Sequence, residues 1–310
     1  MLSRDTAGVK TLIGEFEYPK HGPGMMWEAF RDDVIARGGV VETGSRITGI
    51  RHDGVRVTSV QVTVRGEERD EPVDALISSM PVRELVAAFD PPAPPEVRAA
   101  AERLKYRDFI TVALVINKAE LFPDNWIYVH EPEVKVGRIQ NFKNWSPDMV
   151  PDTSRTCLGL EYFCFEGDGL WSMSDAELIA LGTRELAQIG LASPEDVIDG
   201  AVVRVPKAYP VYDHGYETQL ATVRAHVEGF SNLQLAGRNG MHRYNNQDHS
   251  MVTAMLAVEN IFGARHDVWA VNADAEYHEE TSDNREVAAL ASTQPPVPRP
   301  LGYASPVRER

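Results

Sequence analysis

Cysteine is scarce in this chain. Only two occur among 310 residues, Cys157 and Cys164, and both lie in the apolar run from Thr156 to Phe165. A strand over this run holds the two sulfur atoms too far apart for a disulfide, whose Cα atoms must approach within about 7 Å. Their spacing is also not that of a paired-cysteine metal motif. We therefore expect two core thiols in a reducing compartment, the cytoplasm.

Positive charge and long apolar runs are also lacking. The chain carries 31 Lys and Arg residues against 46 Asp and Glu residues, a net charge of -15. This balance disfavours nucleic acid and anionic membranes as partners. No run approaches the roughly 18 apolar residues of a membrane span, and no signal peptide is recognisable. With 43% hydrophobic residues, the composition indicates a soluble globular chain with room for two domains.

Several motifs that carry chemistry are absent. The sequence contains no G-x-S-x-G nucleophile elbow, no H-E-x-x-H zinc motif, no P-loop and no G-x-G-x-x-G dinucleotide fingerprint. The segment Gly22–Gly24 is too compact for that fingerprint and has proline where a helix must begin. His242 and His249, with Asp248 beside one of them, are conceivable metal ligands, but nothing completes a set, so we expect no metal. These absences favour a cofactor that brings its own chemistry.

The most informative segment lies between residues 232 and 262. Its apolar run Leu233–Ala236 predicts a short buried strand, and Gly237 permits a turn there. A polar segment follows, and apolar residues then recur at helical spacing from Met251 to Ile261. A strand, a glycine turn and a helix N-terminus offer free amide groups and a positive dipole end, which suit an anionic or electron-rich ligand. The alternative is that residues 245–248 simply cap a core helix.

This segment resembles a known motif. Gly237-Arg238, followed by a Tyr- and Asn-rich segment and a helix, is similar to the C-terminal flavin-binding motif of a superfamily of FAD-dependent oxidoreductases. Its members include amine oxidases, protoporphyrinogen oxidases, phytoene desaturases and UDP-galactopyranose mutases. The resemblance extends more weakly from Phe16 to Asn272. Because that superfamily opens with the fingerprint that is missing here, we expect a C-terminal fragment or half of a split protein, and we favour the fragment.

The resemblance implies FAD as the cofactor. Ile47 is similar in position to a residue that touches the adenine end, and the backbone at residues 79–81 would lie beside the cofactor. Backbone amides near the second helix would hold the flavin pyrimidine region as it becomes anionic on reduction. The implied cofactor-binding residues are Ile47, Ser79, Met80, Pro81, Gly237, Arg238, Asn246, Gln247, Asp248 and Ser250. The alternatives are ordinary buried strands at Ile47 and residues 79–81, and a surface ion pair for Arg238 in place of a diphosphate contact.

Candidate substrate residues surround the same segment. Aromatic residues just before it are suited to lining a pocket, although a packed turn at a domain boundary is the alternative. His242 and Arg243 are polar groups suited to contacting a substrate, or they are surface groups. The candidates are Tyr209, Tyr212, His242, Arg243 and Tyr244.

The pattern predicts an α/β (mixed α+β) fold, with an incomplete Rossmann-like FAD-binding domain and an antiparallel-sheet substrate domain. The expected divisions are residues 1–104 and 207–272 for the FAD-binding domain, 105–206 for the substrate domain, and 273–310 for a disordered acidic, proline-rich tail.

Strands are expected at Val40–Val41, Ile47–Arg51, Val55–Val64, Ala75–Ser79, Phe109–Ile116, Trp126–His130, Val136–Phe142, Thr156–Phe165, Ala201–Val205 and Leu233–Ala236. Expected helices include Met25–Arg37, with Trp27, Phe30, Val34 and Ile35 as its apolar face, and Ser174–Ile189, with Ser174 and Glu177 as a capping box.

Three functions are compatible with the resemblance. The favoured one is an FAD-dependent oxidoreductase that passes a hydride from a small substrate to flavin N5. The second is a UDP-galactopyranose mutase-like isomerase of a nucleotide sugar, which uses reduced FAD; however, His242 and Asn245 stand where the mutase motif carries tyrosines. The third is an inactive fragment, or a subunit that needs a separate N-terminal dinucleotide-binding chain to bind FAD, because half a site binds poorly.

Overall fold

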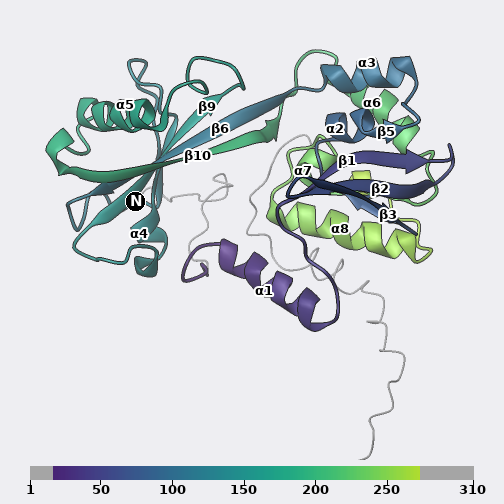
Figure 1. Ribbon diagram of the computed structural model, residues 1–310. Helices are drawn as coiled ribbons and strands as arrows, with labels where there is room; N and C mark the ends of the chain where they lie inside the picture. The colour runs from purple at the N-terminus through teal and green to yellow at the C-terminus, as the bar shows by residue number, and fades with distance from the viewer. Residues whose placement is uncertain (1–16, 273–310) are drawn as a thin grey trace, which may run out of the picture. The chain divides into compact units, whose positions relative to one another are not determined.

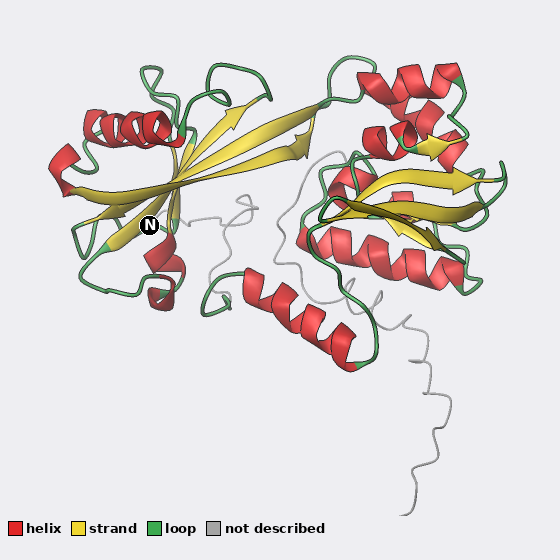
Figure 2. Ribbon diagram, viewed as in Figure 1, coloured by secondary structure: helices red, strands yellow, loops and turns green. Residues whose placement is uncertain are grey.

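The computed structural model describes residues 17–272, nearly all of them within one compact unit, Tyr18–Ala273. The expected disordered tail lies outside the described residues. Figures 1 and 2 show the helices and strands. In chain order they are α1 (Gly24–Ala36), β1 (Ser45–His52), β2 (Val57–Val64), β3 (Glu67–Pro72), β4 (Leu76–Ser78), α2 (Val82–Ala87), β5 (Phe89–Asp90), α3 (Pro95–Arg103), β6 (Tyr106–Ile116), β7 (Trp126–Tyr128), β8 (Arg138–Asn141), α4 (Phe142–Trp145), η1 (Pro147–Met149), β9 (Thr156–Cys164), α5 (Asp175–Gln188), η2 (Pro194–Asp196), β10 (Val197–Pro210), α6 (Tyr216–Val227), β11 (Leu233–Leu235), α7 (Gly237–Gly240), α8 (Gln247–Ile261) and η3 (Val268–Ala270).

One core joins the sheet β3-β2-β1-β5 to the parallel pair β11-β4. β1 and β2 form an antiparallel hairpin, as the Asp53-Gly54 turn predicts. The Asp53 carboxylate accepts hydrogen bonds from the amides of Val55 (2.9 Å) and Arg56 (2.7 Å), and Gly54 has φ 95°. Residues from α2, α3 and α6 complete this core; Leu85 and Val223 are fully buried. Segments from the beginning and the end of the described chain therefore fold together.

A second core lies on one face of the five-stranded sheet β10-β6-β9-β8-β7. Neighbouring strands in this sheet are antiparallel, as expected. In β6, Ile110, Val112 and Leu114 are fully buried, together with Leu178 and Leu186 of α5. Alternation along β6 therefore leaves the opposite face of the sheet free of α5.

α5 begins with the predicted capping box. The Ser174 hydroxyl accepts a hydrogen bond from the Glu177 amide (3.3 Å), and the Glu177 carboxylate accepts one from the Ser174 amide (2.8 Å). These reciprocal bonds satisfy two groups that a helix end otherwise leaves without partners.

Several local expectations are corrected. Val40–Val41 is not a strand, and β1 begins only at Ser45. β3 was not expected, because its sequence Glu67–Pro72 is highly charged and almost wholly exposed. β10 begins before Ala201 and extends to Pro210, and α6 follows in a segment for which no element was predicted. Within residues 17–272, no helix is long and apolar enough to cross a membrane.

Candidate cofactor and substrate site

The ends of β4 and β11 bring together the two segments expected to touch a cofactor. These strands are parallel, with Leu235 opposite Ser78, and the Ala236 amide donates to the Ser78 carbonyl (3.0 Å). Ser79-Met80-Pro81 and Gly237 consequently leave the sheet at the same edge. The carboxyl edge of parallel strands is the usual ligand-binding position in open α/β sheets.

Glycine is required where α7 crosses this edge. A Cβ atom on Gly240 would lie 2.7 Å from the Ser78 carbonyl oxygen and 3.1 Å from the Ser79 Cα atom. Gly237, at the start of α7, has φ 75°, a conformation that side chains disfavour. α7 is therefore held directly against the β4 end.

The N-terminus of α8 is joined to this edge. The Thr253 hydroxyl accepts a hydrogen bond from the Gly237 amide (2.9 Å) and donates one to the Ser250 carbonyl (2.8 Å). Asn246 and His249 form a capping box, in which the Asn246 amide donates to His249 Nδ1 (3.3 Å). Asn246 therefore caps α8, as the alternative interpretation of residues 245–248 expected. Gln247 and Asp248 occupy the first helical turn, where a helix presents its amides and positive dipole end.

Arg238 is a partly buried cation that connects β10 to the segment before α8. Its guanidinium donates to the carbonyl oxygens of Asn245 (2.8 Å) and Ala208 (3.1 Å). Its Cζ atom lies 4.9 Å from the ring centroid of Tyr209 and 4.7 Å from that of Tyr244. These partners carry no negative charge, in contrast to the surface ion pair considered as an alternative. These hydrogen bonds therefore do not neutralise the positive charge of Arg238.

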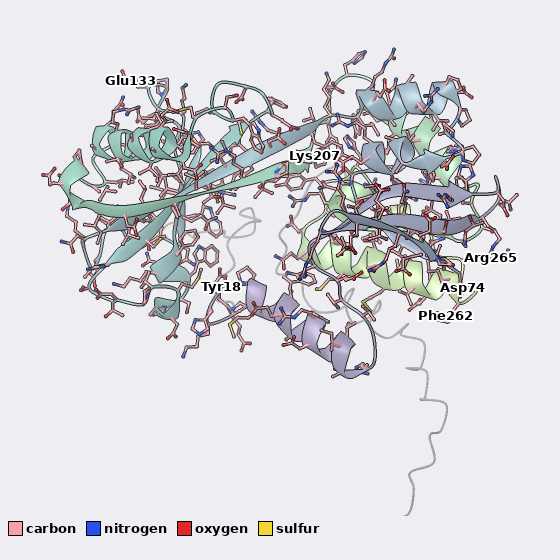
Figure 3. The ribbon with its side chains drawn as sticks, viewed as in Figure 1. Tyr18, Asp74, Glu133, Lys207, Phe262 and Arg265 are labelled. Carbon is pink, nitrogen blue, oxygen red and sulfur yellow. The ribbon has the colours of Figure 1, made fainter. Side chains whose placement is uncertain are left out.

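A bulge in β10 positions Tyr209. The register with β6 shifts between Val205 and Tyr209, and Lys207 has φ 54°. The Lys207 amide donates to the buried Asp108 carboxylate (2.7 Å), and its ammonium group pairs with Glu84 (2.9 Å). Figure 3 labels Lys207 on this strand. Such a bulge changes the direction of the side chains that follow it, and Tyr209 stacks on Tyr244 with ring centroids 5.6 Å apart.

Tyr212 and His242 belong to a cluster of aromatic rings with Tyr106 and Tyr216. The ring of His242 is fully buried, and within the described part of the chain its nitrogen atoms have no hydrogen bond of good geometry. It makes an edge contact with Tyr106 (4.9 Å between centroids) and faces Tyr212 (6.3 Å) and Tyr216 (6.4 Å). Burial lowers the pKa of His242 to about 4, so the ring is neutral at pH 7. A buried neutral ring packs the fold, and contact between His242 and a substrate stays a prediction.

Arg243 and Ile47 both make contacts that stabilise the fold. The Arg243 guanidinium donates to the carbonyl oxygens of Trp269 and Val271, at 3.1 Å for Val271. Ile47 lies in β1 opposite Val62 and packs against the first core. The substrate role of Arg243 and the adenine contact of Ile47 both stay predictions. Tyr244 is 41% exposed, and its amide donates to the Tyr212 hydroxyl (2.6 Å).

A polar network on the sheet face opposite α5 was missed from the sequence. Arg138 of β8 pairs with Glu161 of β9, which is only 5% exposed. Gln140 donates to the same carboxylate (2.9 Å) and accepts a hydrogen bond from the Trp145 indole (2.8 Å). The signal was present, because Glu161 interrupts the apolar sequence of β9. A buried charge in a central strand requires a partner.

Aromatic rings line the same face. Trp145 stacks on Trp126 (5.1 Å) and on Tyr18 (5.0 Å), and Arg138 lies over Tyr128 (5.9 Å). Burial raises the pKa of Tyr244, whereas the positive charges of Arg238 and Arg138 lower it. Both arginines therefore act electrostatically on one tyrosine, and this arginine–aromatic face continues to the Arg238 site.

A family model for flavin containing amine oxidoreductases matches residues 5–249. The chain belongs to this family. Membership implies a flavin cofactor and places the β4 and β11 ends in a flavin-enzyme fold. No curated protein matches the chain.

Solved structures of flavin enzymes share the fold. A reduced UDP-galactopyranose mutase has a TM-score of 0.69 at 20% identity, over 83% of this chain and 55% of the mutase. A putative protoporphyrinogen oxidase from Exiguobacterium sp. 255-15 has a TM-score of 0.58 at 17% identity, over 79% of this chain and 53% of the other. An oxidoreductase from Methanosarcina mazei has a TM-score of 0.51 at 15% identity, over 72% and 50%. This family member therefore spans about half the length of these structures.

Proposed function

We propose that the chain supplies the flavin-facing edge and the substrate face of an FAD-dependent oxidoreductase of the amine oxidase type. The observation that carries the proposal is the close approach of Gly240 to Ser78, where a Cβ atom would lie 2.7 Å from the carbonyl oxygen. It keeps the β4 end, α7 and the α8 N-terminus together within a flavin-family fold. When bound, FAD supplies the hydride acceptor.

The residues present fit one end of that cofactor. Backbone amides in the first turn of α8 favour a group that gains negative charge, and Arg238 adds a cation whose partners are neutral carbonyl oxygens. The buried Ser78 hydroxyl, at the β4 end, has no hydrogen-bond partner among residues 17–272, which leaves a polar atom for a ligand. The diphosphate cradle is proposed to come from another polypeptide segment.

We further propose that a small-molecule substrate lies against Tyr209, Tyr244 and Arg138. Tyr244 is 41% exposed, and stacked rings with nearby arginines suit an anionic or ring-bearing molecule. Tyr212 contributes through its hydrogen bond to the Tyr244 amide (2.6 Å). Cytoplasmic localisation stays part of the proposal, consistent with the free thiols of Cys157 and Cys164.

A second candidate is isomerisation of a nucleotide sugar, as in the UDP-galactopyranose mutase. Its support is the TM-score of 0.69 to that mutase. Against it, His242 and Asn245 stand where the mutase motif carries tyrosines near the substrate, and these side chains are 0% and 1% exposed. We therefore favour the oxidoreductase.

The test incubates the purified chain with FAD, removes free ligand and records the visible spectrum. Flavin absorbance retained with the protein supports cofactor binding by this chain alone. A colourless protein that becomes yellow only with a dinucleotide-binding partner supports the subunit form of the proposal, and a protein colourless in both conditions refutes FAD binding. Peroxide formation with amines, against conversion of UDP-galactopyranose by the reduced complex, then distinguishes the two chemistries.

A further inference from the structure

The edge of β11 that faces away from β4 is unpaired. Asn232 accepts a backbone hydrogen bond from β4 (2.9 Å), and Ala236 donates one to it (3.0 Å). Because backbone groups alternate in direction along a strand, the N–H and C=O groups of Leu233 and Leu235 point away from β4. Within residues 17–272, β4 is the only strand paired with β11, and no residue there hydrogen-bonds these four outward groups.

A cavity runs along this edge. It has a volume of about 360 Å³, and its lining includes Leu233, Gln234 and Leu235. Consecutive side chains of a strand point to opposite faces of the sheet, so a cavity that touches three in a row follows the strand edge. The other lining residues come from α6 and the turn after it, from the end of α8 and from residues 265–269. We call this cavity the β11 groove.

The backbone groups in the β11 groove require a hydrogen-bonding ligand. Leu233 is 3% exposed and Leu235 is 6% exposed, and buried backbone polar groups in proteins almost always have partners. An extended peptide carries donors and acceptors at the spacing of a strand, and it binds an open sheet edge by adding a strand to it. The volume of the groove also lies within the range of ligand-binding cavities, about 300–1,000 Å³.

The side chains of the groove provide an apolar surface for such a peptide. Val227 of α6, Phe230 just after α6 and Val268 of η3 all line the groove, and they are 2%, 4% and 6% exposed. Aliphatic side chains of a peptide bury apolar area against residues of this kind. The groove therefore favours a peptide with aliphatic residues.

The charges of the groove favour an acidic peptide. Arg224 is already paired with Glu228 (2.6 Å) and Asp267 (3.4 Å), and His266 is paired with a carboxylate of α8 (2.6 Å). Arg265, which Figure 3 labels, is exposed and forms no ion pair with any residue between 17 and 272. An acidic side chain on the peptide complements this arginine.

We propose that the β11 groove binds an extended segment of another protein, in which aliphatic and acidic residues alternate. The backbone of the segment pairs with Leu233 and Leu235, and one of its carboxylates pairs with Arg265. This inference goes beyond the proposed function, because no residue of the groove is among those proposed to contact FAD or the substrate. A second copy of this chain, or its own residues 1–16 or 273–310, is a competing occupant.

The experiment titrates the full 310-residue chain into a fluorescein-labelled mixture of synthetic hexapeptides and follows fluorescence polarisation. In the mixture, Val, Ile or Leu alternates with Asp or Glu. We expect half-saturation at or below about 100 μM of the chain, which is weak but specific binding. A mixture with Lys at the acidic positions should bind at least tenfold more weakly. Methylation of the peptide backbone nitrogens should abolish binding, because it removes the donors of strand pairing.

A charge reversal and amide exchange locate the bound peptide. Arg265→Glu should weaken binding of the acidic mixture at least tenfold. Arg184→Glu, at an exposed arginine of α5 outside the groove, is the matched control and should leave binding unchanged. The Leu235 amide should exchange with deuterium at least tenfold more slowly in the complex. The Ala236 amide, which already donates to β4 (3.0 Å), should keep its rate.

The other results overturn the inference. Absence of binding by the acidic mixture refutes it directly. Equal binding of the lysine mixture or of the methylated mixture shows that neither the charge of Arg265 nor strand pairing accounts for the complex. A Leu235 amide that is already protected without peptide shows that the chain itself occupies this edge. Deletion of residues 1–16 or 273–310, or dilution of a dimer, then identifies which competitor is bound there.

Discussion

Gly240 lies against the end of β4 so closely that a Cβ atom on it would be 2.7 Å from the carbonyl oxygen of Ser78. Neither backbone can yield easily, because the Ser78 carbonyl also accepts the Ala236 amide (3.0 Å). This contact fixes α7 over the edge that the proposed cofactor occupies.

Gly240→Ala should therefore destabilise the fold. We expect the free energy of unfolding to fall by about 1–3 kcal/mol, as for other overpacked sites. Urea denaturation measures the change. The matched control is Gly169→Ala, where a Cβ atom meets nothing within 4 Å and stability should be unchanged. An equal effect of both substitutions would show that the contact with Ser78 is not tight.

The sequence predicted the elements whose signals are local. Ser174 and Glu177 cap α5 because their partners lie one turn apart, and the Asp53-Gly54 turn needs only its neighbours. β3 lacked such a signal, because it is an edge strand defined only by its pairing with β2. The apolar pair Val40–Val41 suggested a strand, but Val40 is 85% exposed; apolar character alone does not supply a pairing partner.

The site was predictable only in part, for a similar reason. The Gly237 turn and the α8 start are adjacent in sequence, and the resemblance to flavin enzymes selected them as candidates; their contact with a cofactor stays a prediction. The partners of Arg243, the carbonyl oxygens of Trp269 and Val271, are distant in sequence and carry no side-chain signal. The Arg138–Glu161 pair forms only when β8 and β9 align. Such contacts depend on tertiary register.

Arg238→Lys should weaken both the fold and flavin binding. Lysine cannot reproduce the planar fork that reaches two carbonyl oxygens and lies against two tyrosine rings. We expect the free energy of unfolding to fall by about 2 kcal/mol, the scale of hydrogen bonds from a charged group. Flavin retained after desalting, with a dinucleotide-binding partner present where one is required, should fall at least tenfold. Arg37→Lys, at the exposed residue that follows α1, is the control and should change neither quantity; a normal flavin content in Arg238→Lys would contradict the role of this cation.

Stability should decrease with acid through His242. Its pKa is about 4 in the folded protein, against 6.5 as the ordinary value, because of burial. Between these pH values the unfolded chain binds more protons than the folded one, so the free energy of unfolding rises with pH. The contribution of His242 to stability is fully present above pH 6.5. From pH 7.5 to pH 5 the loss from His242 should be roughly 2 kcal/mol.

Urea denaturation of His242→Phe at the two pH values isolates this contribution. Phenylalanine keeps a ring against Tyr106 but cannot bind a proton, so the acid-dependent loss should shrink by that amount. His226, whose pKa burial also lowers, titrates in both proteins and cancels in the comparison. The control is His214→Gln, at an exposed position, which should retain the wild-type loss. An unchanged loss in His242→Phe would mean that another group governs acid sensitivity.

The Arg138–Glu161 pair should show strong energetic coupling. Glu161 is 5% exposed, so Glu161→Leu leaves a partly buried guanidinium without its carboxylate, at a cost of about 3–5 kcal/mol. Arg138→Met alone leaves the buried Glu161 carboxylate without its guanidinium partner in the same way. The double variant removes both charges and should be more stable than either single variant, because no unpaired charge remains. A double-mutant cycle by urea denaturation should therefore give a coupling energy of about 2 kcal/mol or more.

The control is the double-mutant cycle for Arg51 and Asp70, a pair at 2.6 Å with side chains 47% and 44% exposed. It should give a much smaller coupling energy because solvent screens the pair. Equal coupling in the two cycles would show that the Arg138–Glu161 pair behaves as a surface ion pair, despite the burial of Glu161.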